Sequence, residues 1–202
     1  MYKKIIVFEG IDGSGKTFHL NSIAKFLKKK KIRFIQIREP GGSPNSEILR
    51  KIILKNTSTF KKKTDLLLYM AARNENFENI IKSNYKKKVI LIDRFIDSTF
   101  AYQHYGFNIS KKIIKDLNKF ILGSISPDFT FLHTLPERLL KKKISGKKNR
   151  YDKFNTNFYS RVQKGFIKLG KNNKKYLIIN ANNSKSDNIK IIQSKIINLL
   201  NL

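Results

Sequence analysis

An apolar run at residues 5–8 leads directly into a segment with the pattern Gly-x-x-x-x-Gly-Lys-[Ser/Thr]. A strand followed by a glycine-rich turn and a helix lets backbone N–H groups converge on an anion at the helix N-terminus. In this pattern Lys16 supplies a cation for the β- and γ-phosphates, and Thr17 offers a hydroxyl to Mg²⁺. We predict that the segment binds a nucleoside triphosphate; the alternative is a chance glycine turn. Its residues are Gly10, Ile11, Asp12, Gly13, Ser14, Gly15, Lys16 and Thr17.

The length of the chain limits its organisation. Its 202 residues suit one α/β domain with a large core, so we treat residues 1–202 as a single domain. The sequence has no cysteine, which excludes disulfides and thiolate metal sites. The predicted first strand leaves no room for a cleavable signal, and no apolar run approaches the roughly 18 residues of a membrane span. We therefore expect a cytoplasmic enzyme without a membrane partner.

A formal net charge of +29 would ordinarily suggest a nucleic-acid partner. Lysine, however, is used heavily together with isoleucine and asparagine, in runs such as residues 28–31 and 61–63. A/T-rich codons encode all three residue types, so a drifting AT-rich genome explains the charge without a polyanion. We expect no stable nucleic-acid partner, although the surplus charge can attract anionic substrates.

Strand-like and helix-like segments alternate along the chain. Crossovers of this kind imply parallel pairing, which predicts a three-layer, doubly wound α/β fold of about five parallel strands. One long helix is marked by a stripe of six side chains, Leu67, Met70, Ala71, Asn74, Phe77 and Ile81, and the last helix by Ile189, Ile192, Ile196 and Leu199. The predicted strands are residues 5–8, 32–37, 89–92, 129–132 and 176–179.

The apolar strand at residues 89–92 ends in Asp93 and Arg94. In an open parallel sheet the carboxyl ends of the strands face the ligand crevice. Asp93 can therefore reach Mg²⁺ together with Thr17, and Arg94 can bind a second phosphate. The alternative is an exposed ion pair on the surface.

Two pairs of side chains at helical i,i+4 spacing suit a flat heterocycle. Tyr69 and Arg73 place an aromatic plate beside a planar donor group. Thr99 and Gln103 repeat this spacing, and the Gln103 amide can pair with an imide N–H flanked by carbonyls. Each pair taken alone is more often core packing or surface decoration.

Several segments in this order resemble bacterial thymidylate kinases. They are residues 8–17, Arg38-Glu39-Pro40-Gly41-Gly42, residues 69–73, residues 93–103 and residues 127–130. The resemblance implies a P-loop kinase fold with a short lid at about residues 145–152. It also implies phosphoryl transfer from ATP to dTMP, with Mg²⁺ as cofactor and a homodimer as the assembly. A cis peptide bond between Glu39 and Pro40 is part of the same resemblance.

The resemblance also assigns roles to individual residues. Tyr69 matches the aromatic that stacks on thymine, Arg73 the donor to the base carbonyl, and Gln103, with Thr99 beside it, the amide that reads the base edge. The residues that surround the acceptor sugar and phosphate are Asp12, Tyr102, Arg38, Arg50 and Arg94. The expected catalytic residues are Lys16, Asp12, Arg94 and Arg150. Because Gly13 stands where some relatives carry an arginine, Arg150 is expected to reach over the phosphates from the lid.

Two departures from the family pattern stand out. The segment Leu132-His133-Thr134 replaces Leu-Asp-Val, and His133 is interpreted as a tolerated strand-end residue because nothing nearby in the sequence supplies an orienting partner. Several lid arginines are lysines, which lack a bidentate donor group. Another nucleoside monophosphate kinase, or a P-loop regulatory or nucleic-acid-dependent NTPase, remains an alternative.

Overall fold

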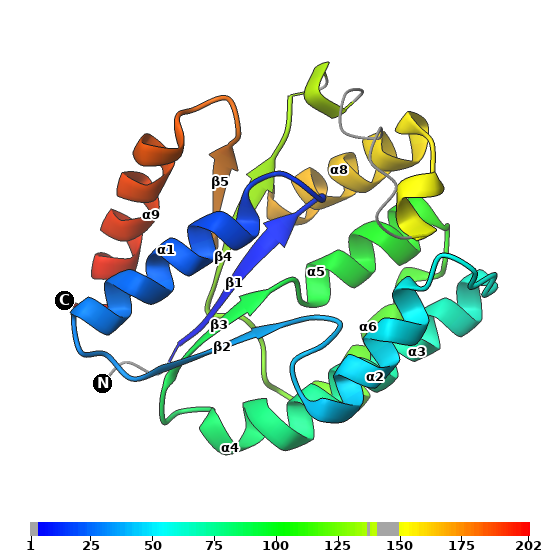
Figure 1. The fold of residues 1–202 in the computed structure, drawn as a ribbon, viewed down its shortest axis with the longest axis horizontal. Coiled ribbons are helices and arrows are strands. Elements are labelled where there is room, and N and C mark those ends of the chain that lie inside the picture. The colour runs from blue at the N-terminus through cyan, green and yellow to red at the C-terminus, as the bar shows by residue number, and fades with distance from the viewer. Residues whose placement is uncertain (1–3, 137, 141–149) are drawn as a thin grey trace.

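The computed structural model describes residues 4–136, 138–140 and 150–202. Its centre is a parallel sheet of five strands in the order β2-β3-β1-β4-β5 (Figure 1). The strands are β1 (Ile5–Gly10), β2 (Phe34–Arg38), β3 (Val89–Asp93), β4 (Phe129–Thr134) and β5 (Tyr176–Asn180). This confirms the predicted fold class and all five predicted strands, each extended or shifted by one or two residues.

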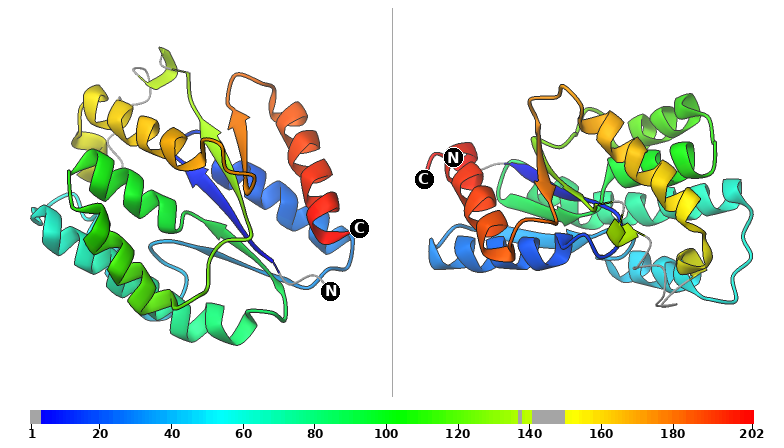
Figure 2. Two further views of the ribbon diagram at one scale, coloured as in Figure 1. Left: turned by 180° about the vertical axis from the view of Figure 1, so that it is seen from behind. Right: turned by 90° about the horizontal axis from the view of Figure 1, so that it is seen from above.

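Helices cover both faces of the sheet, which gives the three layers seen in Figure 2. The α-helices are α1 (Lys16–Lys29), α2 (Pro44–Leu54), α3 (Lys62–Asn76), α4 (Lys82–Asn84), α5 (Ile96–Thr99), α6 (Lys111–Leu122), α8 (Thr156–Gly170) and α9 (Lys185–Leu200). Two π-helical segments, η1 (Phe77–Ile81) and η2 (Phe100–Gly106), and the 3₁₀ turn η3 (Arg150–Lys153) complete the described elements. No described helix has the length and apolarity that a bilayer crossing requires.

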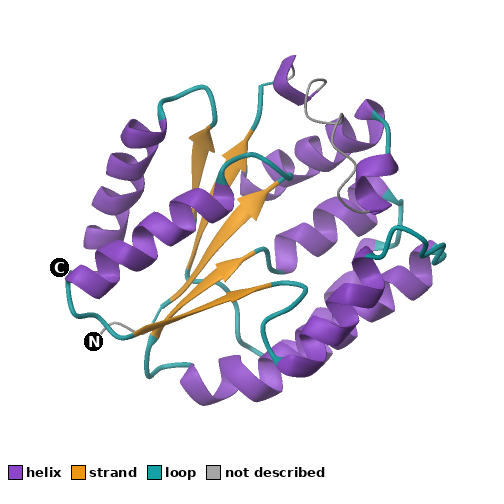
Figure 3. Ribbon diagram, in the orientation of Figure 1, coloured by secondary structure: helices purple, strands orange, loops and turns teal. Residues whose placement is uncertain are grey.

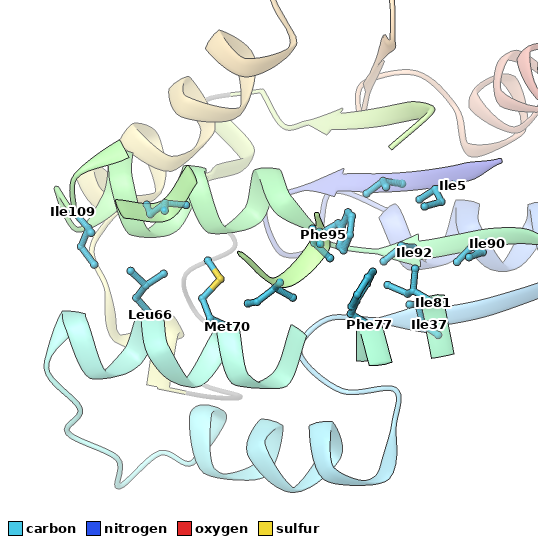
Figure 4. Packing of buried hydrophobic residues seen from close by; sticks show 14 residues of the cluster. Ile5, Ile37, Leu66, Met70, Phe77, Ile81, Ile90, Ile92, Phe95 and Ile109 are labelled. Carbon is cyan, nitrogen blue, oxygen red and sulfur yellow. The ribbon is translucent and has the colours of Figure 1, made fainter. Parts of the chain in front are cut away.

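Alternation along each strand sends side chains to opposite faces of the sheet. On one face Ile6 and Phe8 of β1 pack with Leu20 of α1 and Ile192 of α9. The other face, drawn in Figure 4, joins Ile5 and Val7 to apolar residues of α3, η1 and α6. The central strands are covered on both faces, which accounts for their continuous apolar runs, such as residues 89–92 of β3.

The predicted stripe of the long helix is only partly correct. Met70, Phe77 and Ile81 are buried, but Leu67 is 57% exposed and Ala71 also faces solvent. The buried face of α3 instead runs through Leu66, Met70 and Arg73. After Asn76 the helix widens into the π-segment η1, which shifts the side-chain register. In α9 the buried stripe is likewise Asn188, Ile192, Ile196 and Leu200, with Ile189 and Leu199 only half-buried.

Candidate active site

The glycine-rich loop joins the tip of the central strand β1 to the start of α1 (Figures 1 and 3). Gly10, Gly13 and Gly15 all have positive φ, at 132°, 71° and 94°. A Cβ on Gly10 would lie 2.2 Å from the backbone oxygen of His133, so β4 passes too close for any side chain there. The turn therefore depends on glycine, as the predicted phosphate cradle requires.

Lys16 and Ser14 fold back into this loop. The Lys16 ammonium donates to the Ile11 carbonyl at 2.8 Å, and the Ser14 hydroxyl donates to the same carbonyl at 2.9 Å. Burial, and secondarily the charge of Arg94, lower the pKa of Lys16 to about 8. An incoming polyanion would favour the charged form and hold this ammonium against the phosphates.

The predicted metal-binding residues meet at the carboxyl ends of the strands. The Thr17 hydroxyl in the first turn of α1 donates to Asp93 Oδ2 at 2.6 Å. The two side chains come together because β1 and β3 are adjacent, with Phe8 opposite Asp93. A hydroxyl and a carboxylate are oxygen donors of the kind that Mg²⁺ prefers. No group of three or more histidine, aspartate or glutamate side chains suited to a metal occurs in the described residues.

Arg94 connects the cradle to a neighbouring cavity. Its φ is 68°, and its guanidinium bonds to Asp12 Oδ1 at 2.5 Å, to the Gly10 carbonyl at 2.9 Å and to the Ser98 hydroxyl at 3.2 Å. The surrounding protein would raise the pKa of Asp12 by desolvation, but the charges of Arg94 and Lys16 outweigh this effect and lower it to about 2. Asp12 is therefore an anion that can accept a hydrogen bond.

The cavity beside the cradle has about 630 Å³ of empty space when its open mouth is included. Both predicted i,i+4 pairs line it, and so do the residues expected near the acceptor sugar and phosphate, except Arg38. Of the predicted residues, the lining contains Asp12, Arg50, Tyr69, Arg73, Arg94, Thr99, Tyr102 and Gln103. The Arg94 guanidinium carbon also lies 5.5 Å from the centre of the Tyr102 ring. Asp12 and Arg94 bond to each other beside the cradle and also line the cavity, so they belong to both parts of the site.

Arg73 and Gln103 are held by buried polar partners. Arg73, 3% exposed, donates to Glu39 Oε2 at 2.8 Å and to Asn118 Oδ1 at 2.7 Å. Gln103 donates its amide Nε2 to Asp65 Oδ2 at 3.3 Å, while its Oε1 has no hydrogen-bond partner among the described residues. Burial raises the pKa of Glu39, an effect that Arg73 opposes. The Glu39–Pro40 bond is cis, as predicted.

Arg38 and Arg150 lie outside this cavity. Arg38 is exposed and pairs with Glu47 at 3.1 Å. Arg150 does not reach the cradle: its guanidinium bonds to the Asp65 carboxylate and to the Ile53 carbonyl. Most of the predicted lid, residues 145–149, lies outside the described residues. Tyr151, which the sequence did not single out, lines the cavity.

Two groups near the cradle were missed or misjudged from sequence. Glu9 is fully buried and accepts hydrogen bonds from the Phe95 N–H at 2.7 Å and the Ser98 hydroxyl at 2.6 Å, which fixes the turn behind Arg94. The signal in the sequence was a charged residue placed directly between the apolar run of the first strand and Gly10. The expectation that His133 has no orienting partner is wrong, because His19 Nδ1 lies 3.0 Å from His133 Nε2. Sequence could not show this contact across 114 positions.

A cradle for phosphates and a cavity for a flat ring that share Asp12 and Arg94 place the chain among the P-loop kinases of nucleoside monophosphates. Comparison with known sequences identifies the family: its sequence model, described as thymidylate kinase, matches residues 8–192. The chain belongs to the thymidylate kinase family.

Relatives agree over most of the chain. A thymidylate kinase of Thermosipho africanus is 37% identical and the match covers 89% of this chain and 90% of the relative. A thymidylate kinase of Prochlorococcus marinus is 38% identical, with coverage of 97% and 94%. The crystal structure of thymidylate kinase from Ehrlichia chaffeensis superposes with a TM-score of 0.77 at 31% identity and covers 98% of each chain.

Proposed function

We propose that this enzyme transfers the γ-phosphoryl group of ATP to dTMP, forming ADP and dTDP. The observation that carries the proposal is the junction of the two sites: Asp12 and Arg94 belong to the cradle and also line the cavity that contains Tyr69, Arg73 and Gln103. This arrangement would bring the acceptor phosphate beside the donor phosphates. Membership of the thymidylate kinase family selects dTMP as the acceptor.

In the proposed reaction an oxygen of the dTMP phosphate attacks the γ-phosphorus. A new P–O bond forms while the bond between the γ-phosphorus and the β,γ-bridging oxygen breaks, and that electron pair leaves with ADP. The reaction needs alignment and charge neutralisation more than a protein nucleophile. Lys16 and Arg94 would supply positive charge, and Asp12 would accept a hydrogen bond from the 3′-hydroxyl of the acceptor.

Thr17 and Asp93 would hold Mg²⁺ together with the ATP phosphates. When bound, such an ion offsets the negative charge of the phosphates and orients them. Tyr102 would lie against the 2′ position of the sugar and disfavour ribose. Arg38, Arg50 and Arg150 remain part of the proposal as phosphate-binding residues, and Arg150 would have to leave Asp65 to act there.

A coupled assay of ADP formation tests the function. We expect dTMP to stimulate ADP formation more than UMP, CMP, AMP or GMP, with dUMP as the comparison for the missing methyl group. Equal stimulation by UMP would refute the assignment to dTMP.

We also propose a homodimer located in the cytoplasm, in line with the family resemblance. The exposed apolar side chains of α6, Ile113 at 50% and Phe120 at 86% exposure, are compatible with burial against another subunit. Light scattering during size-exclusion chromatography would distinguish a dimer from a monomer.

A further inference from the structure

Asp65 is a buried carboxylate outside the base-binding cavity. It lies in the first turn of α3 and is 1% exposed. Three side chains donate to it: the Gln103 amide at 3.3 Å, the Arg150 guanidinium and the Tyr151 hydroxyl. The position near a helix N-terminus and the ion pair with Arg150 both favour its charged form.

The charge of Asp65 fixes the orientation of the Gln103 amide. An ionised carboxylate only accepts hydrogen bonds, so it must face the amide NH₂ group and not the amide oxygen. Rotating the amide by 180° would bring Gln103 Oε1 against Asp65 and leave the buried carboxylate without this donor. Gln103 Oε1 is therefore the atom left without a partner among the described residues, on a side chain that lines the cavity.

Gln103 Oε1 is an acceptor, and Arg73 supplies a donor in the same cavity. Glu39 and Asn118 hold its guanidinium, whose remaining N–H groups can only donate. A donor from Arg73 and an acceptor from Gln103 match a pyrimidine edge that has a carbonyl beside a ring N–H. A pyrimidine with a 4-amino group beside an unprotonated ring nitrogen presents the reverse pattern.

We propose that Asp65 is a specificity-determining positioning residue, which locks the Gln103 amide so that the enzyme selects an acceptor base with a ring N–H over a 4-aminopyrimidine. The inference rests on the proposed function, since it assumes a pyrimidine nucleotide in this cavity. Asp65 acts through Gln103 and does not itself line the cavity.

The test is the ratio of kcat/KM for dTMP to kcat/KM for dCMP. Asp65→Asn has nearly the same shape but offers both a donor and an acceptor, so it tolerates either amide orientation. We expect this ratio to fall by about tenfold or more, because a lost buried hydrogen bond changes discrimination on that scale. If dCMP turns over too slowly, its inhibition constant against dTMP replaces kcat/KM.

Two variants separate orientation from general damage. Asp65→Glu keeps a carboxylate that only accepts hydrogen bonds. The open space near Phe60 and Phe107 also borders Asp65 and leaves room for the longer side chain. The ratio of kcat/KM for dTMP to that for dCMP should therefore stay within about twofold of the wild-type value. Arg150→Ala removes another partner of Asp65 but leaves the amide facing a carboxylate, so it should slow both acceptors equally.

An equal loss for dTMP and dCMP in Asp65→Asn would overturn the proposal and leave Asp65 a purely structural role. If Asp65→Asn does not fold, Asp65→Ser provides the same comparison. A wild-type enzyme that uses dCMP as well as dTMP would instead refute the proposed function before any variant is compared.

Discussion

At the scale of single residues, the contacts of Arg150 in this structure differ from those that its expected role requires. The family resemblance expects this arginine over the phosphates, whereas its guanidinium bonds to Asp65 in this structure. Because Gly13 leaves the cradle without an additional cation, we predict that Arg150 moves to the transferred group during the reaction.

Replacing Arg150 tests that movement. Arg150→Ala should lower kcat by about 10²-fold and leave dTMP affinity nearly unchanged, since an interaction made only in the transition state appears in kcat. Arg150→Lys should recover part of the loss, because a point charge replaces a planar donor group. Steady-state kinetics against ATP and dTMP give both values. An unchanged kcat for the alanine variant would restrict Arg150 to its contact with Asp65.

The Thr17 and Asp93 pair gives a prediction about metal dependence. Chelation of Mg²⁺ should abolish activity, and Thr17→Val should raise the Mg²⁺ concentration for half-maximal activity by about tenfold, as expected for the loss of one ligand or its supporting contact. The shift in melting temperature that Mg²⁺ and ADP produce together should shrink in parallel. Ser22→Ala is the matched control, since this hydroxyl of the same helix bonds only to the Phe18 carbonyl among the described residues. The same Mg²⁺ requirement in both variants would contradict the assignment.

At the scale of elements, His19 of α1 contacts His133 of β4. His133 Nδ1 lies 3.2 Å from the Phe131 carbonyl and donates to it, so His133 Nε2 accepts from His19 Nδ1. The His133 ring is neutral in this arrangement, because its Nε2 must carry a lone pair to accept. Burial, and then the neighbouring His19 and Lys16, lower the pKa of His133 to about 3.

The pair predicts a loss of stability in acid. His133 has an ordinary pKa of 6.5 when unfolded and about 3 when folded, so below pH 6.5 the unfolded chain binds a proton that the folded chain does not. The free energy of unfolding should therefore fall between pH 6.5 and pH 3, by at most about 1.4 kcal/mol per pH unit from this group. Urea unfolding across this range measures the slope. His133→Asn should flatten it, while His104→Asn controls for removal of an imidazole; equal slopes in the wild type and His133→Asn would contradict the prediction.

The turn from β1 into the cradle gives a second prediction at this scale. Gly10→Ala should lower the free energy of unfolding by about 2 to 4 kcal/mol and abolish ATP binding, because it combines a disfavoured φ with a clash against β4. Gly123→Ala is the control: its φ is 58°, but nothing lies within 4 Å of the added Cβ. We expect this control to lose about 1 to 3 kcal/mol, the cost of its disfavoured φ of 58° and ψ of −120° without a clash, and to retain ATP binding. Denaturant titration measures the free energy of unfolding, and nucleotide titration measures ATP binding. Equal losses of stability in Gly10→Ala and Gly123→Ala would show that the structure relieves the clash with β4.

At the scale of the whole molecule, the charge of +29 is the property that the proposed reaction does not require. If it reflects composition alone, added DNA should change ATP turnover by less than about twofold at about 150 mM salt, where nonspecific contacts weaken. Turnover with and without duplex DNA, in the presence of dTMP, measures this. A DNA-stimulated ATPase would favour the alternative of a nucleic-acid-dependent NTPase.

The sequence by itself determined the parallel five-stranded fold and the glycine turn, and it predicted most of the candidate base-binding side chains that the structure places around one cavity. Each of these follows from local spacing: apolar runs define the strands, the glycine pattern defines the turn, and i,i+4 spacing places Tyr69 with Arg73 on one helical face. Parallel strands also bring their carboxyl ends to one edge of the sheet, which is why Thr17 and Asp93 could be paired before their 2.6 Å contact was seen.

Tertiary structure decided which partner each buried polar group receives. The contacts of Asp65 with Gln103, of His19 with His133 and of Arg150 with Asp65 span 38, 114 and 85 positions. No periodicity relates residues that far apart, because their distance depends on how helices pack on the sheet. A buried polar group must find a partner wherever the fold supplies one, and only the assembled chain determines which residue that is.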